Sequence, residues 1–327
     1  MSRKKRRQEV LTVGAVVLLI LVMIYSGLQI LESTVFASLD VIPEAVPSKT
    51  IVRDGVEYFP KQDITVVMVL GIDNPGPMTG TEYHKNSGLA DVVMLVILDD
   101  AVKEYSVLQL NRDTMLEMTA LGIRGEKAGT YYGQLALAHT YGSGLEDSSL
   151  NVKDTLMSLI HGLTVDHYVT MSLDAIPILN DAVGGVRVTV EDDFSAIDPE
   201  IKIGEMVLHG QQALTFVQTR KDVGSQMNVS RMDRQKEYMR GFEEALSTAI
   251  EDNGTFVLDT YDAVSPYIVS DCTVNTLSLL VDRFSEYELG EVITPEGENV
   301  RGEEYMEFYL DEEKFEELTL RLFYAPK

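Results

Sequence analysis

The chain has no tryptophan and a single cysteine, Cys272, among its 327 residues. One cysteine excludes an intramolecular disulfide, and an isolated cysteine is more often small core filler than a nucleophile. The sequence also lacks a Walker loop, a GxGxxG turn and a Gly-x-Ser-x-Gly elbow, which removes the enzyme classes that depend on them. The five histidines follow no zinc-binding spacing, so we expect no zinc site; they are His84, His139, His161, His167 and His209. His139 lies in an apolar helical stretch and is expected in the core.

Basic residues are scarce outside the N-terminus. Five of the 27 Lys and Arg residues lie within the first nine positions, which leaves 22 against 51 of the 52 acidic residues. The remainder of the chain therefore carries about −29 formal charges. Such a surface repels nucleic acid, so we expect no nucleic-acid partner. An anionic substrate would need locally concentrated arginines or a metal ion.

A long apolar run stands out near the N-terminus. Residues 1–9 form a basic tail, and the uncharged residues 10–31 at ~1.5 Å each span roughly a ~30 Å hydrocarbon core. The basic flank predicts a protein that crosses the cell membrane once, with its N-terminus in the cytoplasm and its C-terminal domain outside the cell. The alternative is a signal peptide cleaved after residues 35–37 (VFA), but secretory apolar regions usually run only ~7–15 residues.

The rest of the chain is predicted as a linker over residues 32–60 and an α/β domain over 61–327, with its core at 63–250 and a C-terminal extension at 251–327. Apolar runs predict strands, and helical spacing predicts helices between them. At least one hairpin sits among the helical crossovers, so we expect a mixed central sheet sandwiched by helices. The expected strands are 64–70, 91–98, 104–112, 167–173 and 186–190, and the expected helices are 148–161, 174–184, 210–217, 230–250, 256–264 and 274–287. A further strand and then a helix that ends at residues 323–324 are expected after these.

The hairpin formed by residues 91–98 and 104–112 carries acidic residues at its open end. If Leu98 pairs with Ser106, Asp91 lies directly opposite Asp113, and opposed like charges are destabilising. A divalent cation would compensate them, and Mg²⁺ prefers carboxylate oxygens. The alternative is a solvated strand end in a register shifted by one residue.

A second cluster lies on the helix predicted to begin at Ser230. Arg231, Arg234 and Gln235 fall on one side of that helix at i, i+3 and i+4. Arginine forks beside the free N–H groups of a helix start predict a phosphate site, which Arg220 could join. The alternative is an exposed charged turn paired with some of the many acidic side chains.

At these residues the sequence resembles the LytR-CpsA-Psr (LCP) family of Gram-positive cell-envelope proteins. Seven segments match the family's motifs in order and spacing: 69–73 (VLGID), 90–94 (ADVVM), 110–114 (LNRDT), 135–142 (LALAHTYG), 181–186 (DAVGGV), 208–214 (LHGQQAL) and 231–235 (RMDRQ).

The resemblance implies a Mg²⁺-dependent phosphotransferase outside the membrane. It would move an anionic glycopolymer, such as teichoic acid, from a polyprenyl-pyrophosphate carrier to peptidoglycan. The polyprenyl tail would lie in an apolar groove with the pyrophosphate at its arginine-rich mouth. By position, Asp91 and Asp113 would hold the metal, and Arg112, Arg220 and Arg231 the pyrophosphate. Supporting substrate contacts would come from Arg234, Gln235 and Asp73.

The sequence departs from the family pattern at several site positions. Leu89 and Gln218 replace arginines, Gln134 replaces a basic residue and Ala136 replaces an asparagine. Each lost cation in a desolvated site removes roughly 1.5–3 kcal/mol of charged hydrogen bonding. The alternative function is therefore an impaired envelope protein that binds polyprenyl-phosphate lipid or cell-wall glycan without turnover.

Overall fold

A computed structural model describes residues 50–327, apart from 75, 81–87, 123, 220–221, 225–227, 254–255, 273–275, 277–278, 281–282 and 284–285. The predicted tail, the predicted membrane anchor and most of the predicted linker lie outside the described residues. No helix in the described part of the chain has the length and apolarity of a membrane span.

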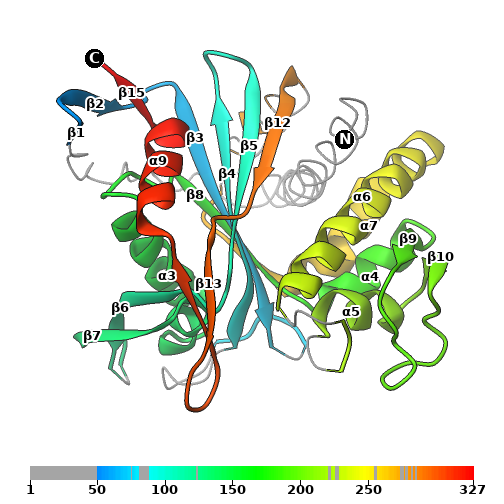
Figure 1. Cartoon of the computed structure of the whole chain (residues 1–327). Coiled ribbons are helices and arrows are strands. Elements are labelled where there is room, and N and C mark those ends of the chain that lie inside the picture. Colours follow the sequence, from blue (N-terminus) through cyan, green and yellow to red (C-terminus); the bar gives the residue numbers. More distant parts are fainter. Residues whose placement is uncertain are drawn as a thin grey trace.

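The fold is built on a six-stranded mixed sheet (Figure 1). β3 pairs in parallel with β8, and β5 pairs in parallel with β12, while the remaining pairs are antiparallel. This confirms the mixed α/β sheet predicted from the hairpin among crossovers. In spatial order the strands are β11 (Ile268–Ser270), β8 (His167–Ser172), β3 (Ile64–Asp73), β4 (Leu89–Asp99), β5 (Glu104–Leu110) and β12 (Glu288–Ile293).

Two apolar cores lie on the two faces of this sheet. In β3, Val67 and Val69 belong to one core, while Met68 and Leu70 belong to the second, as the period of two along a strand requires. Helices cover both faces, so the central strands are apolar throughout (Figure 1). The first face is covered by α4 (Ala175–Ala182), α5 (Gln211–Gln218), α6 (Asn228–Asp252) and α7 (Phe256–Val264), and the second by η1 (Leu135–Tyr141), α3 (Glu146–Leu159) and α9 (Glu312–Phe323).

Short strands form four smaller sheets around the central one. Residues 51–60, predicted as the end of the linker, form two strands that pair with each other and with the C-terminus, so the fold begins inside the predicted linker. One sheet has three strands, with β2 (Val56–Pro60) between β1 (Ile51–Arg53) and β15 (Tyr324–Pro326). The other three are pairs: β6 (Met115–Leu121) with β7 (Lys127–Gln134), β9 (Val186–Val190) with β10 (Gly204–Leu208), and β13 (Gly297–Arg301) with β14 (Met306–Leu310). The short helix η2 (Ser265–Tyr267) precedes β11.

Helix starts are where the sequence predictions are least accurate. α3 begins at Glu146, so Ser148 and Ser149 lie inside it, and the Ser148 hydroxyl accepts a hydrogen bond from the Gly144 N–H at 2.8 Å. α6 begins at Asn228, two residues before its predicted start at Ser230. Serine and threonine hydroxyls can bond backbone groups within a helix as well as at its cap, so their presence alone does not fix the boundary. The predicted helix over 274–287 falls largely outside the described residues.

Candidate active site

The register of the β4–β5 hairpin differs by one residue from the predicted one. Leu98 pairs with Tyr105, and the ladder ends where Val93 pairs with Leu110. The connecting turn needs only four residues, because Lys103 adopts a left-handed conformation with φ 57° and Asp99 pairs with Glu104. Continued in this register, Arg112 rather than Asp113 is the residue across from Asp91.

Asp113 reaches the site through a turn rather than along the strand. The Asn111 side-chain oxygen accepts the backbone N–H of Asp113 at 2.9 Å, and Thr114 donates its N–H to the Asn111 carbonyl at 3.0 Å. Asparagine favours this kind of local turn because its side chain can mimic a backbone acceptor. The predicted strand 104–112 therefore ends at Leu110, and Asp113 is turned toward Arg112.

Asp91 is directed into the site by a β-bulge. Between β3 and β4, Gly71 pairs with Val92 but Ile72 pairs with Ala90, so Asp91 is one extra residue with no partner across the ladder. A bulge interrupts the alternation of side chains and can re-aim one of them. The bulge therefore lets the Asp91 side chain leave the apolar face of the sheet, on which strict alternation along β4 would place it.

Four charged side chains meet at this point. Arg112 forms an ion pair through Nη1 with Asp91 Oδ1, and its Nε lies 3.4 Å from Asp113 Oδ1. Arg231, from α6, places Nη1 3.0 Å from Asp91 Oδ2. Their side chains are 10 % exposed or less. Two guanidinium groups balance two carboxylates, which is how buried charges are normally kept. We call Asp91, Arg112, Asp113 and Arg231 the charged cluster.

Gln134, at the end of β7, completes the surroundings of Asp113. Its side-chain nitrogen donates to Asp113 Oδ1 and to the Met306 carbonyl, both at 2.8 Å. The family resemblance identified Gln134 only as the replacement of a basic residue. The structure shows that its amide donates directly to Asp113, one of the two predicted metal ligands.

An apolar cavity opens beside the charged cluster. It encloses ≈ 770 Å³ of empty space, counting its open mouth, between the sheet and helices α4, α5 and α6. Val92, next to Asp91 on β4, and Gln235, one turn after Arg231 on α6, both line it, so the cavity and the cluster share a border. Its remaining lining is apolar and includes Met94, Ile176, Leu179, Met239 and Phe242. The family resemblance predicted an apolar groove with arginines at its mouth, and the structure has an apolar cavity bordered by Arg112 and Arg231.

The remaining predicted site residues do not all join the cluster. Arg234 donates through Nε to the Phe216 carbonyl at 2.9 Å and pairs with Asp192 at 2.5 Å, so it fastens α6 to α5. Burial lowers the pKa of Arg234, an effect that Asp192 opposes. Gln235 accepts a hydrogen bond from Gln109 at 3.2 Å, and exposed Asp73 accepts one from Gln218 at 2.7 Å. Arg220 lies outside the described residues.

The donor set of the charged cluster is suited to Mg²⁺. Asp91 and Asp113 supply hard carboxylate oxygens, and both are held against Arg112. Within the described ranges, no third acidic, histidine or cysteine ligand joins them closely enough to complete a protein cage. Mg²⁺ is usually held by one or two carboxylates together with water and substrate phosphates, so two carboxylates suffice.

The balanced charges predict a large effect of Asp91 on stability. We expect Asp91→Ala to lower the free energy of unfolding by about 3–5 kcal/mol, because it leaves the Arg112 and Arg231 guanidinium groups buried without their shared partner. Urea unfolding of the full chain measures this difference. The control is Asp233→Ala, whose carboxylate is 67 % exposed and should change stability by less than about 0.5 kcal/mol. Equal effects of the two substitutions would contradict the buried ion pairs.

Comparison with known proteins adds a family and a fold. A model of the LytR_cpsA_psr family matches residues 31–323. A relative from Oceanobacillus iheyensis, named polyisoprenyl-teichoic acid--peptidoglycan teichoic acid transferase TagU, is 23 % identical over 87 % of this chain and 83 % of its own length. Several further relatives match over about half of their length.

Solved structures share the architecture. Protein gbs0355 from Streptococcus agalactiae superposes with a TM-score of 0.62 at 20 % identity, over 80 % of this chain and 86 % of that one. The structure described as TagT bound to LI-WTA gives 0.60 at 20 % identity, over 88 % and 98 % of the two chains. At this level of identity the likeness concerns the fold.

Proposed function

The chain belongs to the LytR_cpsA_psr family, and from this premise we propose that it transfers an anionic glycopolymer from a polyprenyl-pyrophosphate carrier to peptidoglycan. The observation that carries the proposal is an apolar cavity bordered by a buried cluster of arginines and carboxylates. A carrier of this class has an apolar tail and a charged diphosphate joined end to end, which matches that border. The relative from Oceanobacillus iheyensis is named for such a transfer.

The balance of charge supports a metal ion in the reaction. The cluster is neutral as it stands, with Arg112 and Arg231 against Asp91 and Asp113. A diphosphate diester brings about two negative charges, which a buried site must compensate. Asp91 and Asp113 would hold Mg²⁺, which supplies that compensation and polarises the phosphoryl oxygens.

The chain's own residues would position the diphosphate. Arg112 and Arg231 can each share their guanidinium fork between an aspartate and a phosphoryl oxygen. The acceptor hydroxyl forms the new P–O bond to the phosphorus that carries the polymer, and the bond from that phosphorus to the bridging oxygen breaks. Polyprenyl phosphate leaves and takes up the hydroxyl proton, directly or through water. Charge neutralisation and positioning dominate phosphoryl transfer of this kind. We further propose that residues 10–31 anchor the chain in the cell membrane with this domain outside.

The test is transfer by the full chain from a short-chain polyprenyl-pyrophosphate substrate to peptidoglycan fragments, with Mg²⁺ titrated. We expect Mg²⁺-dependent formation of the phosphodiester product. Asp113→Asn, which keeps the side chain's shape but removes the negative charge, should raise the Mg²⁺ concentration needed for half-maximal rate by more than about 100-fold, because the loss of a ligand exceeds the loss of an outer partner. Product formation that needs no divalent cation would contradict the metal's role.

A second function is favoured by one observation, the amide of Gln134 on Asp113. A neutral amide in place of a cation suits binding of the lipid carrier without turnover. In that case the full chain would retain polyprenyl phosphate in native mass spectrometry, and no product would form at any Mg²⁺ concentration.

A further inference from the structure

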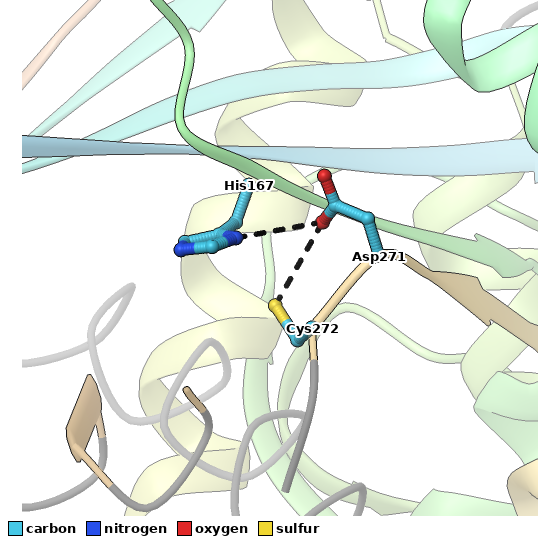
Figure 2. A group of neighbouring side chains, drawn as sticks. All are labelled: His167, Asp271 and Cys272. Carbon is cyan, nitrogen blue, oxygen red and sulfur yellow. Dashed lines mark hydrogen bonds and ion pairs between the residues drawn. The ribbon is translucent and has the colours of Figure 1, made fainter. Parts of the chain in front are cut away.

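Three potential metal ligands meet at the opposite end of the sheet from the charged cluster. His167 begins β8 and pairs with Val67 on β3, whereas Asp91 lies beside the Gly71–Val92 pair. Continuing the antiparallel β11–β8 register past Ser270 sets Cys272 across from His167. Figure 2 shows the side chains of His167, Asp271 and Cys272 turned toward one another.

The distances approach those of a tetrahedral zinc site. Asp271 Oδ1 lies 3.7 Å from His167 Nδ1 and 4.0 Å from Cys272 Sγ. With usual zinc–ligand bond lengths, a regular tetrahedron sets these two separations at about 3.4 and 3.6 Å. All three ligand atoms lie within 4.8 Å of one another. Small side-chain rotations would therefore bring them around one ion.

Neighbouring groups orient the central carboxylate. The Tyr168 N–H donates to Asp271 Oδ1 at 2.8 Å, and Lys153 Nζ lies 3.6 Å from Oδ2. Ligating carboxylates are typically fixed by such outer hydrogen bonds. Lys153 approaches the oxygen that does not face the histidine and the thiol, so it balances Asp271 without standing between the three ligand atoms.

The Cys272 thiol is buried, as it would be if it only filled space in the core, but it is also placed to bind a metal ion. Burial raises the pKa of Cys272 to about 12, so the metal-free protein keeps the thiol protonated at neutral pH. A metal ion replaces that proton when the thiolate coordinates. The side chains of His167 and Asp271 are each 28 % exposed, which leaves the ion a path from solvent.

We propose that His167, Asp271 and Cys272 bind one zinc ion, with water as the fourth ligand. Such a site would tie the chain after edge strand β11 to the start of β8. Sequence spacing predicted no zinc site, because the ligands lie about a hundred residues apart and meet only through strand pairing. The proposal is independent of the transfer reaction.

The test loads the chelator-treated full chain with Zn²⁺, or with Co²⁺ as a spectroscopic probe. We expect one zinc per chain after dialysis, a higher melting temperature, and a thiolate-to-Co²⁺ charge-transfer band. Cys272→Ser should abolish the band. Both Cys272→Ser and His167→Gln should weaken zinc binding by more than about a hundredfold, a larger loss than the removal of a group that only hydrogen-bonds a metal ligand would cause.

Two further variants separate a built site from surface chelation. His209→Gln removes an exposed imidazole elsewhere and should leave zinc binding unchanged. Lys153→Met removes an outer partner that orients Asp271 and should weaken zinc binding by about 10–100-fold, which surface chelation would not show. Absence of one-to-one binding in the unsubstituted protein would overturn the proposal. So would equal zinc retention by Cys272→Ser and the His209 control.

Discussion

Replacement of Arg112 by alanine is expected to reduce glycopolymer transfer by about 10³–10⁵-fold, the range found when an arginine that stabilises a phosphoryl-transfer transition state is lost. Arg112 contacts both carboxylates of the charged cluster, so its removal leaves Asp91 and Asp113 held together by no shared partner. It also removes one of the two guanidinium groups of the charged cluster. Release of polyprenyl phosphate at saturating Mg²⁺ measures the effect.

Two matched variants test whether geometry or charge is responsible. Arg112→Lys keeps the charge but not the planar fork, and should recover only a small part of the rate. Arg187→Ala removes an exposed arginine from β9 and should leave transfer unchanged. Full activity in Arg112→Ala would refute the role of the cluster, whatever the stability of the variant.

Filling the apolar cavity is expected to cost about 10³-fold in kcat/KM for a long-chain carrier. Ile176 lines the cavity from α4 and is only partly buried, so a tryptophan there would extend into the empty space. Excluding about five tail carbons at ~0.8 kcal/mol each removes ~4 kcal/mol of binding. Competition between long-chain and short-chain carriers in one assay reports the change directly.

The same helix supplies the control for this experiment. Ile178 is also partly buried and packs against the same core, but it does not line the cavity. Ile178→Trp should therefore alter stability without changing the preference for tail length. If Ile176→Trp uses long-chain and short-chain carriers as the unsubstituted protein does, the tail does not occupy this cavity.

Apolar patterning was enough to predict most of the central sheet. β3 and β4 are nearly continuous apolar runs because both faces of the sheet are covered. The strands β6, β7 and β13 were missed, since they mix polar with apolar residues and most of their residues are not buried. A half-exposed strand at the edge of a fold shows little alternation of apolar and polar residues, so its sequence does not identify it as a strand.

The candidate site was predicted in composition but not in detail. Asp91, Arg112, Asp113 and Arg231 do come together, yet through a register one residue away from the predicted one. The turn residue with positive φ is a lysine, which gives no sequence signal for that conformation. Arg234 shares the helix face of Arg231 but binds the neighbouring helix, which spacing along one helix cannot distinguish.

The bulge at Asp91 sets a cost that the folded protein bears permanently. Removing that single residue would let Gly71–Val92, Ile72–Ala90 and Asp73–Leu89 follow one another in an unbroken ladder. The resulting hairpin would be more regular and would lack the buried acid altogether. It would also leave Arg112 and Arg231 buried without the carboxylate they share, so a smoother ladder at this position would come with a less stable protein.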